Sequence, residues 1–157
     1  MGYRQIKHLL AMPVLDHELY SQVIQKGKQA VEMLQAQDLD GFFKFAEEGW
    51  HKFPDPKESW NQGCSYAKMV FKEALSHQEM DQAKTWLTRM VENNNRLKLF
   101  DFECEYYQGK YYFETGEYNA AFDKFDYVVK GAEYRYFDEN DSKYLDFFNR
   151  ELLARGN

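Results

Sequence analysis

Apolar residues recur at helical spacing along nearly the whole chain, in segments that are separated by turn residues. No stretch alternates apolar and polar residues in the way that a half-buried strand does. The three prolines are Pro13, Pro54 and Pro56, and all of them lie outside the periodic segments. Because proline interrupts the helical hydrogen-bond ladder, this placement predicts an all-α chain.

The breaks between periodic segments divide the chain into helices of ordinary length. Seven helices are expected, at residues 16–37, 39–53, 58–76, 80–92, 99–114, 118–130 and 142–152. Pro54 and Pro56 are expected to stop the second helix, and Asn93, Asn94 and Asn95 to cap the fourth. Short connections predict that consecutive helices pair as antiparallel hairpins.

Length and charge limit the classes of partner. The chain of 157 residues is sufficient for one domain with a core, so we expect a single domain over 1–157. Its net charge of -6 disfavours nucleic acid and an anionic membrane surface as partners. A basic protein partner suits this sign, although mild acidity that only keeps the protein in solution explains it as well.

The two cysteines, Cys64 and Cys104, lie far apart and form no paired motif. They predict reduced thiols and a cytoplasmic location rather than a disulfide framework or a zinc site. No run approaches the ~20 apolar residues of a membrane span. The apolar stretch near the N-terminus is interrupted by Lys7, His8 and Pro13, so no signal peptide is expected.

Motifs of catalysis do not occur in the sequence. The four histidines, His8, His17, His51 and His77, are scattered and have no metal-ligand spacing, and there is no glycine-rich phosphate loop or nucleophile elbow. We therefore expect no catalytic residues, no metal and no cofactor. A metal-free enzyme that uses clustered carboxylates is the alternative.

The segment GKYYFETGEYNAAFDKF closely resembles a tetratricopeptide repeat. The residues that carry the resemblance are Gly109, Tyr112, Gly116, Glu117, Tyr118, Ala121 and Phe125. Two weaker copies lie upstream, and the equivalent positions Phe42, Ala83 and Ala121 are 41 and 38 residues apart, against about 34 in a strict repeat. The resemblance implies about three stacked, degenerate repeats over 16–131 and a capping segment at 132–153.

The stretch from Leu99 to Ser142 is acidic and aromatic, with eleven acidic residues against four basic ones. Either its rings fill the core while its acids are solvated, or some of both share an exposed binding face. In a repeat of this kind the first helix of each pair lines the inner groove. The resemblance therefore implies partner-binding residues on two helices: Trp60, Tyr66, Lys68, Asp101, Glu105, Tyr106 and Tyr112. Trp60 and Tyr112 suit the core equally.

The ending EYRYFDENDSKYLDFF is similar to that of small tetratricopeptide-like immunity proteins of bacterial toxin-immunity loci. The residues that fit the order are Arg135, Phe137, Asp141, Lys143, Tyr144 and Phe147. This resemblance implies that the protein blocks a toxin, and it adds Arg135 to the candidate contacts. Alternatively, Arg135 pairs with a neighbouring acid and fixes the capping segment.

These observations predict a protein-binding module rather than an enzyme. The first hypothesis is an immunity protein, a monomer or weak dimer, whose acidic surface occludes the basic site of a toxin domain. The second is an adaptor or chaperone-like scaffold that captures a peptide in its groove.

Overall fold

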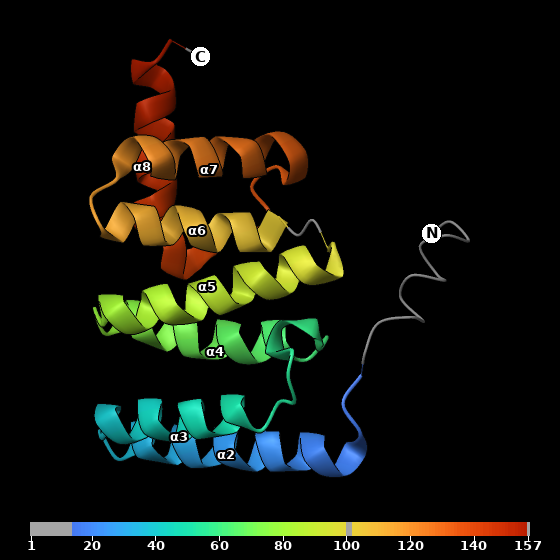
Figure 1. Cartoon of the computed structure of the whole chain (residues 1–157). Helices are drawn as coiled ribbons and strands as arrows, with labels where there is room; N and C mark the ends of the chain where they lie inside the picture. The colour runs from blue at the N-terminus through green and yellow to red at the C-terminus, as the bar shows by residue number, and fades with distance from the viewer. Residues whose placement is uncertain (1–13, 100–101, 157) are drawn as a thin grey trace. The chain divides into compact units, whose positions relative to one another are not determined.

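The structure is a computed structural model, which describes residues 14–99 and 102–156 (Figure 1). These residues form helices and no strand, so the prediction of an all-helical chain is confirmed for them. The α-helices are α2 (His17–Gln35), α3 (Leu39–His51), α4 (Gly63–Ser76), α5 (Met80–Leu97), α6 (Phe102–Glu114), α7 (Tyr118–Ala132) and α8 (Ser142–Ala154). Two short 3-10 helices are η1 (Lys57–Ser59) and η2 (Glu139–Asp141).

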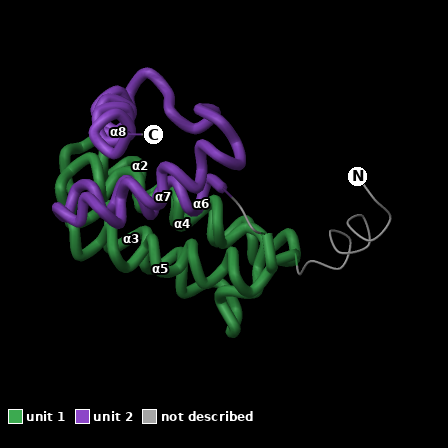
Figure 2. Tube along the Cα trace, turned by 90° about the horizontal axis from the view of Figure 1, so that it is seen from above, with its two compact units in different colours: residues 1–99 green, residues 100–157 purple. Residues whose placement is uncertain are grey.

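The chain divides into two compact units, residues 1–99 and 100–157 (Figure 2). The first unit holds the hairpins α2–α3 and α4–α5, and the second holds the hairpin α6–α7 together with α8. The pairing of consecutive helices is therefore confirmed. That residues 1–157 act as a single domain stays a prediction.

All three hairpins turn in the same way. The turn residues Gln37, Gln78 and Gly116 have left-handed backbones, with φ of 61°, 60° and 81°. After each of them the next backbone N–H donates to a carbonyl five residues earlier, as in Glu79 to Ala74 at 2.9 Å. This is the hydrogen bond of the Schellman motif, which ends a helix by satisfying its last carbonyl groups. The shared turn lets the second helix of each pair fold back along the first.

Aromatic rings fill the core of the first unit. Trp50 on α3 and Trp86 on α5 meet edge to face, with ring centroids 5.7 Å apart. Tyr66 on α4 lies 5.9 Å from the Trp86 ring, and Phe53 lies 5.3 Å from the Trp50 ring. One cluster thus joins three of the four helices of this unit, because each hairpin alone leaves an apolar face to bury.

The second unit has its own aromatic core. Phe125 on α7 is fully buried, and its ring contacts those of Tyr106, Phe137 and Phe147 at centroid distances of 5.6, 5.5 and 6.4 Å. In Figure 1, α8 runs across α6 and α7. It therefore covers the apolar side that this hairpin would otherwise expose.

Two expected helix boundaries are wrong, and one side chain connects them. The third expected helix was placed from residue 58, but α4 begins at Gly63 and Trp60 lies in the preceding loop. The expected cap at residue 93 is instead part of α5, which continues to Leu97. Asn93 is fully buried, and its amide donates to the carbonyls of Glu58 at 3.2 Å and Trp60 at 2.6 Å. A residue type that often caps helices here holds a loop against the helix.

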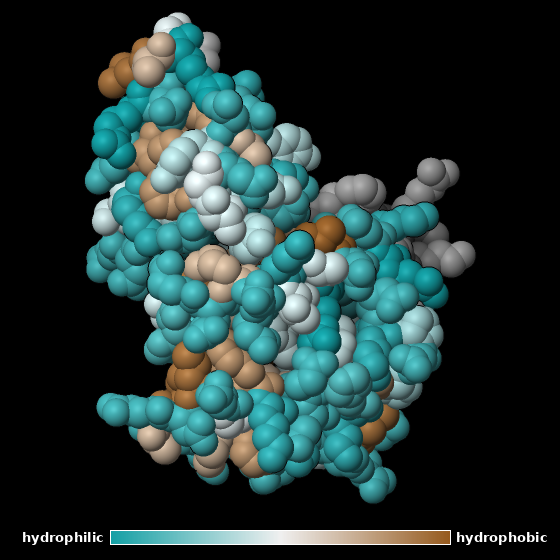
Figure 3. All heavy atoms as spheres, turned by 60° about the vertical axis from the view of Figure 1, so that its left-hand side comes forward, coloured by the Kyte–Doolittle hydropathy of each residue, from teal (hydrophilic) through white to brown (hydrophobic). Residues whose placement is uncertain are grey.

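Figure 3 shows a face of the molecule that is mostly hydrophilic, with separate apolar patches. Among the described residues, no helix combines the length and the apolar character that crossing a bilayer requires.

Candidate binding groove

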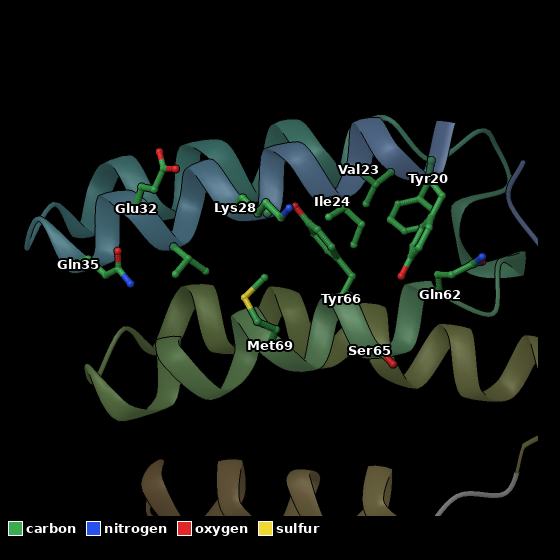
Figure 4. Close-up of a pocket in the computed structure, with 13 residues that line it drawn as sticks. Tyr20, Val23, Ile24, Lys28, Glu32, Gln35, Gln62, Ser65, Tyr66 and Met69 are labelled. Carbon is green, nitrogen blue, oxygen red and sulfur yellow. The ribbon is translucent and has the colours of Figure 1, made fainter. Parts of the chain in front are cut away.

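An open groove of about 510 Å³ separates α2 from α4 in the first unit (Figure 4). It is lined by Tyr20, Val23, Ile24, Gly27, Lys28, Val31, Glu32, Gln35, Phe53, Gln62, Ser65, Tyr66 and Met69. These two helices are the first members of their hairpins, so the side chains of α2 face those of α4 across the groove.

The α2 wall of the groove is apolar and exposed. Tyr20, Ile24 and Val31 keep 36, 37 and 38% of their surface accessible, whereas Val23 and Ala30 on the same helix are fully buried. Tyr20, Ile24 and Val31 lie four and seven residues apart in turn, which places them on one side of a helix. A contiguous apolar surface in a groove marks a binding site more often than a scattered exposed residue does.

The α4 wall is held in place by Tyr66. Its side chain is 7% exposed, and its hydroxyl donates a hydrogen bond of 2.6 Å to the Ala46 carbonyl on α3. Burial raises the pKa of the Tyr66 hydroxyl well above its usual range, so this hydroxyl stays protonated and remains a donor. Tyr66 thus fixes the spacing of α3 and α4, and its ring forms part of the groove surface.

Polar groups mark the ends of the groove. Figure 4 shows Tyr20 and Gln62 at one end and Gln35 at the other, with Met69 pointing from α4 towards α2. The side-chain oxygen of Gln62 accepts a hydrogen bond of 3.4 Å from the backbone N–H of Leu15. The chain that precedes α2 therefore passes beside this end of the groove.

Among the predicted contacts in the first unit, only Tyr66 lines the groove. Trp60 is half-buried in the loop before α4, where its indole N–H donates to the Pro54 carbonyl at 2.8 Å. Lys68 is half-buried on α4 and is not among the residues that line the groove.

The predicted contacts in the second unit are largely engaged in that unit. Glu105 forms an ion pair with Lys124, and Tyr106 is 2% exposed. Tyr112 is half-buried on α6, and Arg135 is exposed. Asp101 lies outside the described residues. These side chains do not form one exposed patch within their unit, because Tyr106 belongs to its core.

A buried ion pair explains the position of Tyr106. The Tyr106 hydroxyl donates 2.6 Å to Asp141, which also accepts 3.0 Å from the Lys110 ammonium. Lys110 lies over the rings of Tyr106, Tyr107 and Tyr144, at 5.5, 5.3 and 5.2 Å from their centroids. Burial first, and then the bond to Asp141, raise the pKa of the Tyr106 hydroxyl far above its usual range. This network connects α6 with the start of α8.

Arg135 forms no ion pair with any residue that the structure describes. The alternative prediction, in which it pairs with a neighbouring acid to fix the capping segment, is therefore not seen among these residues. The Lys110–Asp141 pair holds that part of the chain instead.

A second cleft, between α3 and α5, is lined mostly by polar residues. Arg89 donates two hydrogen bonds of 2.7 Å to the Glu47 carboxylate, and the guanidinium lies 4.4 Å from the centroid of the Trp86 ring. This hydrogen bonding lowers the pKa of the Glu47 carboxyl, and a carboxylate held in the ionised form is a poor proton donor. Within residues 14–99 and 102–156, no cluster of His, Cys, Asp and Glu could hold a metal ion.

Ile24 and Val31 were not among the binding residues predicted from the sequence. Val23 and Ala30 stand one residue before them and carry the stripe that faces the core. The width of the apolar face of α2 could have indicated the groove. It carries two adjacent stripes of apolar residues, and contact with α3 covers only one of them.

No family model, no curated protein and no solved structure matched the chain in the comparisons made.

Proposed function

We propose that this protein is a tetratricopeptide-like binding module whose α2–α4 groove captures an apolar segment of another protein. The observation that carries the proposal is the exposure of Tyr20, Ile24 and Val31 along one wall of the groove. Leaving these side chains accessible forgoes about 25 cal/mol for each Å² of apolar surface, and a partner that covers them recovers this free energy.

The chemistry of the groove defines the segment that it takes. Ile24, Val31 and Met69 contribute apolar surface to the lining, and Lys28 and Glu32 add one charge of each sign. An amphipathic helix with apolar residues at positions i, i+4 and i+7 would place its apolar face between the two walls and its polar face outside. This is the adaptor function that the sequence left as an alternative.

The test is selection of amphipathic peptides on the immobilised full chain, followed by calorimetric titration of a selected peptide. Ile24→Asp should weaken its binding by at least about tenfold, because a carboxylate is then buried against apolar side chains. Leu153→Asp is the matched control, since Leu153 is 79% exposed on α8 and lies outside the groove. Equal affinity of the two variants would mean that the peptide binds elsewhere.

A second candidate function follows from the surface of α7 and the chain after it. Tyr118, Tyr127 and Tyr134 are 53, 57 and 46% exposed, and the nearby carboxylates of Asp123 and Glu133 are exposed as well. Tyrosines among acidic groups suit a basic protein partner, as expected for an immunity protein that occludes a toxin site. Tyr118 and Tyr127 are on α7 and Tyr134 follows it, whereas the exposed rings were expected on the helix that is α6.

The immunity function is tested with the product of the adjacent gene. A stable one-to-one complex should form, and Asp123→Lys should slow its association while Asp40→Lys, an exposed acid on α3, should not. If both variants associate at the rate of the parent chain, the α7 surface does not bind that product.

A further inference from the structure

We propose that the outer face of α8 pairs with the same face of a second copy of this chain, with the two helices antiparallel. The outer face consists of Lys143, Asp146, Arg150 and Leu153, which lie three, four and three residues apart on α8. This is the spacing of the positions at which two helices meet in a coiled coil. The face belongs to the second unit and shares no residue with the α2–α4 groove, so the inference stands independently of the proposed function.

The outer face is the side of α8 that its own unit leaves uncovered. Tyr144, Phe147 and Phe148 carry the buried side of the helix, whereas all four residues of the outer face are exposed. Leu153 keeps 79% of its surface accessible, more than any other large apolar residue that the structure describes. An open groove of about 480 Å³ at this side is lined by Phe113, Lys143, Asp146, Asn149, Arg150 and Leu153.

The two central charges of the face have no partner. Asp146 and Arg150 are four residues apart on one helix, yet neither forms an ion pair within residues 14–99 and 102–156. In a two-fold symmetric pair, each contact between two different residues occurs twice. A register that places Asp146 opposite Arg150 of the partner subunit therefore also places Arg150 opposite the partner's Asp146. Both charges are then paired in both copies.

The same register brings apolar groups together at the ends of the face. Leu153 of the partner subunit lies opposite Lys143, because each lies three residues outside the central charges. The Lys143 ammonium pairs with Glu114 and lies 5.1 Å from the centroid of the Tyr144 ring, which leaves its methylene groups for apolar contact. The Phe113 ring lies at this end as well, 5.2 Å from the Tyr144 ring. The partner's Leu153 is thus covered by Phe113 and by the stem of Lys143.

The charges also decide the direction and the strength of the pairing. In a parallel pair each central charge would face its own copy, and such like-charge contacts are unfavourable. The 13 residues of α8 extend about 20 Å, so the contact is smaller than a standard protein interface. We therefore expect a dissociation constant on the order of 100 μM at low salt, and weaker association as salt screens the charges.

Sedimentation equilibrium of the full chain at low salt measures this association. Asp146→Arg makes both central charges positive and Arg150→Asp makes both negative, so each variant alone should self-associate at least about tenfold more weakly than the parent chain. Mixed in equal amounts, the two variants should form a heterodimer, because each positive position then faces a negative one. Glu92→Arg makes the same charge change at an exposed position of α5, and this control should associate as the parent chain does.

The mixture separates pairing across two copies from any effect within one helix. Both substituted positions are exposed, so the variants should fold, and their circular dichroism spectra check this. A parent chain that stays monomeric at about ten times the expected dissociation constant would overturn the proposal. Single variants that associate as strongly as the parent chain would place the contact elsewhere. A mixture of folded variants that does not pair would show that the two central charges do not face each other across a two-fold axis.

Discussion

Tyr66 shows how one side chain connects the core with the candidate groove. Its ring contacts Trp86, its hydroxyl is bonded to Ala46, and the same ring forms part of the α4 wall. A β-carbon added at Gly49 would lie 2.1 Å from the Tyr66 hydroxyl oxygen. Gly49 is therefore required by the close approach of α3 to this one side chain.

Gly49→Ala should destabilise the protein by about 1–3 kcal/mol, because the new methyl group meets Tyr66 in a packed core. Tyr66→Phe alone should cost about 1 kcal/mol through the loss of its hydrogen bond. In the double variant the nearest contact is gone, so the double variant should lose less stability than the sum of the losses of the two single variants. Urea unfolding of the four chains measures this coupling, and strictly additive losses would mean that the two residues do not meet.

The Lys110–Asp141 pair is a second case in which a single residue holds an element in place. Their side chains are 11 and 9% exposed, so removing one charge leaves the other in a site with little water. We expect Asp141→Asn to destabilise the second unit by about 3 kcal/mol. Lys130→Met is the control, because the Lys130 side chain is 75% exposed in its pair with Asp126 and should contribute less than about 1 kcal/mol.

A third residue predicts a dependence on pH. Arg89 lowers the pKa of Glu47 in the folded chain below its ordinary value of 4.5. The stability that this pair contributes is therefore fully present above pH 4.5 and is lost as the pH falls through the lowered value. We expect the difference in unfolding midpoint between the parent chain and Glu47→Gln to be constant near neutral pH and to shrink below pH 4.5. A difference that grows in acid would contradict the sign.

At the scale of the elements, the same turn recurs in each hairpin, but the residue at its left-handed position is not always the one that adopts this conformation most easily. Gln78 has a φ of 60° where Gly116 has 81°, and glycine adopts this region without the strain that a side chain adds. Gln78→Gly should stabilise the chain by about 0.5–1 kcal/mol, and Gly116→Gln should destabilise it by a similar amount. A β-carbon at Gly116 would meet no atom within 4 Å, so the second effect isolates the backbone term. Thermal unfolding measures both effects. Unfolding temperatures that shift in the same direction in the two variants would contradict the shared turn.

Much of the element order was predictable from the sequence, because apolar spacing and turn residues act within a few positions of each other. Gly116 indicates the turn in which it lies, and Ala121 indicates the close packing of α7. Asn93 was misread, since its partners at Glu58 and Trp60 are more than thirty residues away. Long-range contacts of this kind leave no local pattern.

The candidate site was less predictable than the helices. Aromatic and acidic residues were expected to mark it, but Tyr106 satisfies the buried Asp141 and Glu105 pairs with Lys124. The composition of a segment shows how many such residues it has, but not which of them already bind neighbouring side chains in the fold. The groove lies where Ile24 and Val31 find no covering helix among the described residues, a property of packing rather than of residue type.

For the molecule as a whole, the question is whether its two units unfold together. Each has its own buried rings, with Phe42 among those of the first and Phe125 among those of the second, and both are fully buried. In proteins built from stacked helix pairs, stability is approximately the sum of the stability of each pair and the coupling between neighbours. A core substitution then acts mainly on the unit that contains it.

Phe125→Ala should cost about 3–5 kcal/mol, which is a large share of the stability of a unit of this size. Native-state hydrogen exchange should become faster for amides of α6, α7 and α8, while those of α3 and α5 keep their protection. Phe42→Ala is the matched substitution, and it should produce the reverse pattern. If either variant speeds exchange equally throughout the described chain, residues 1–157 unfold as the single cooperative domain that the sequence predicts. Separate responses would instead make each core the unit on which a destabilising substitution acts.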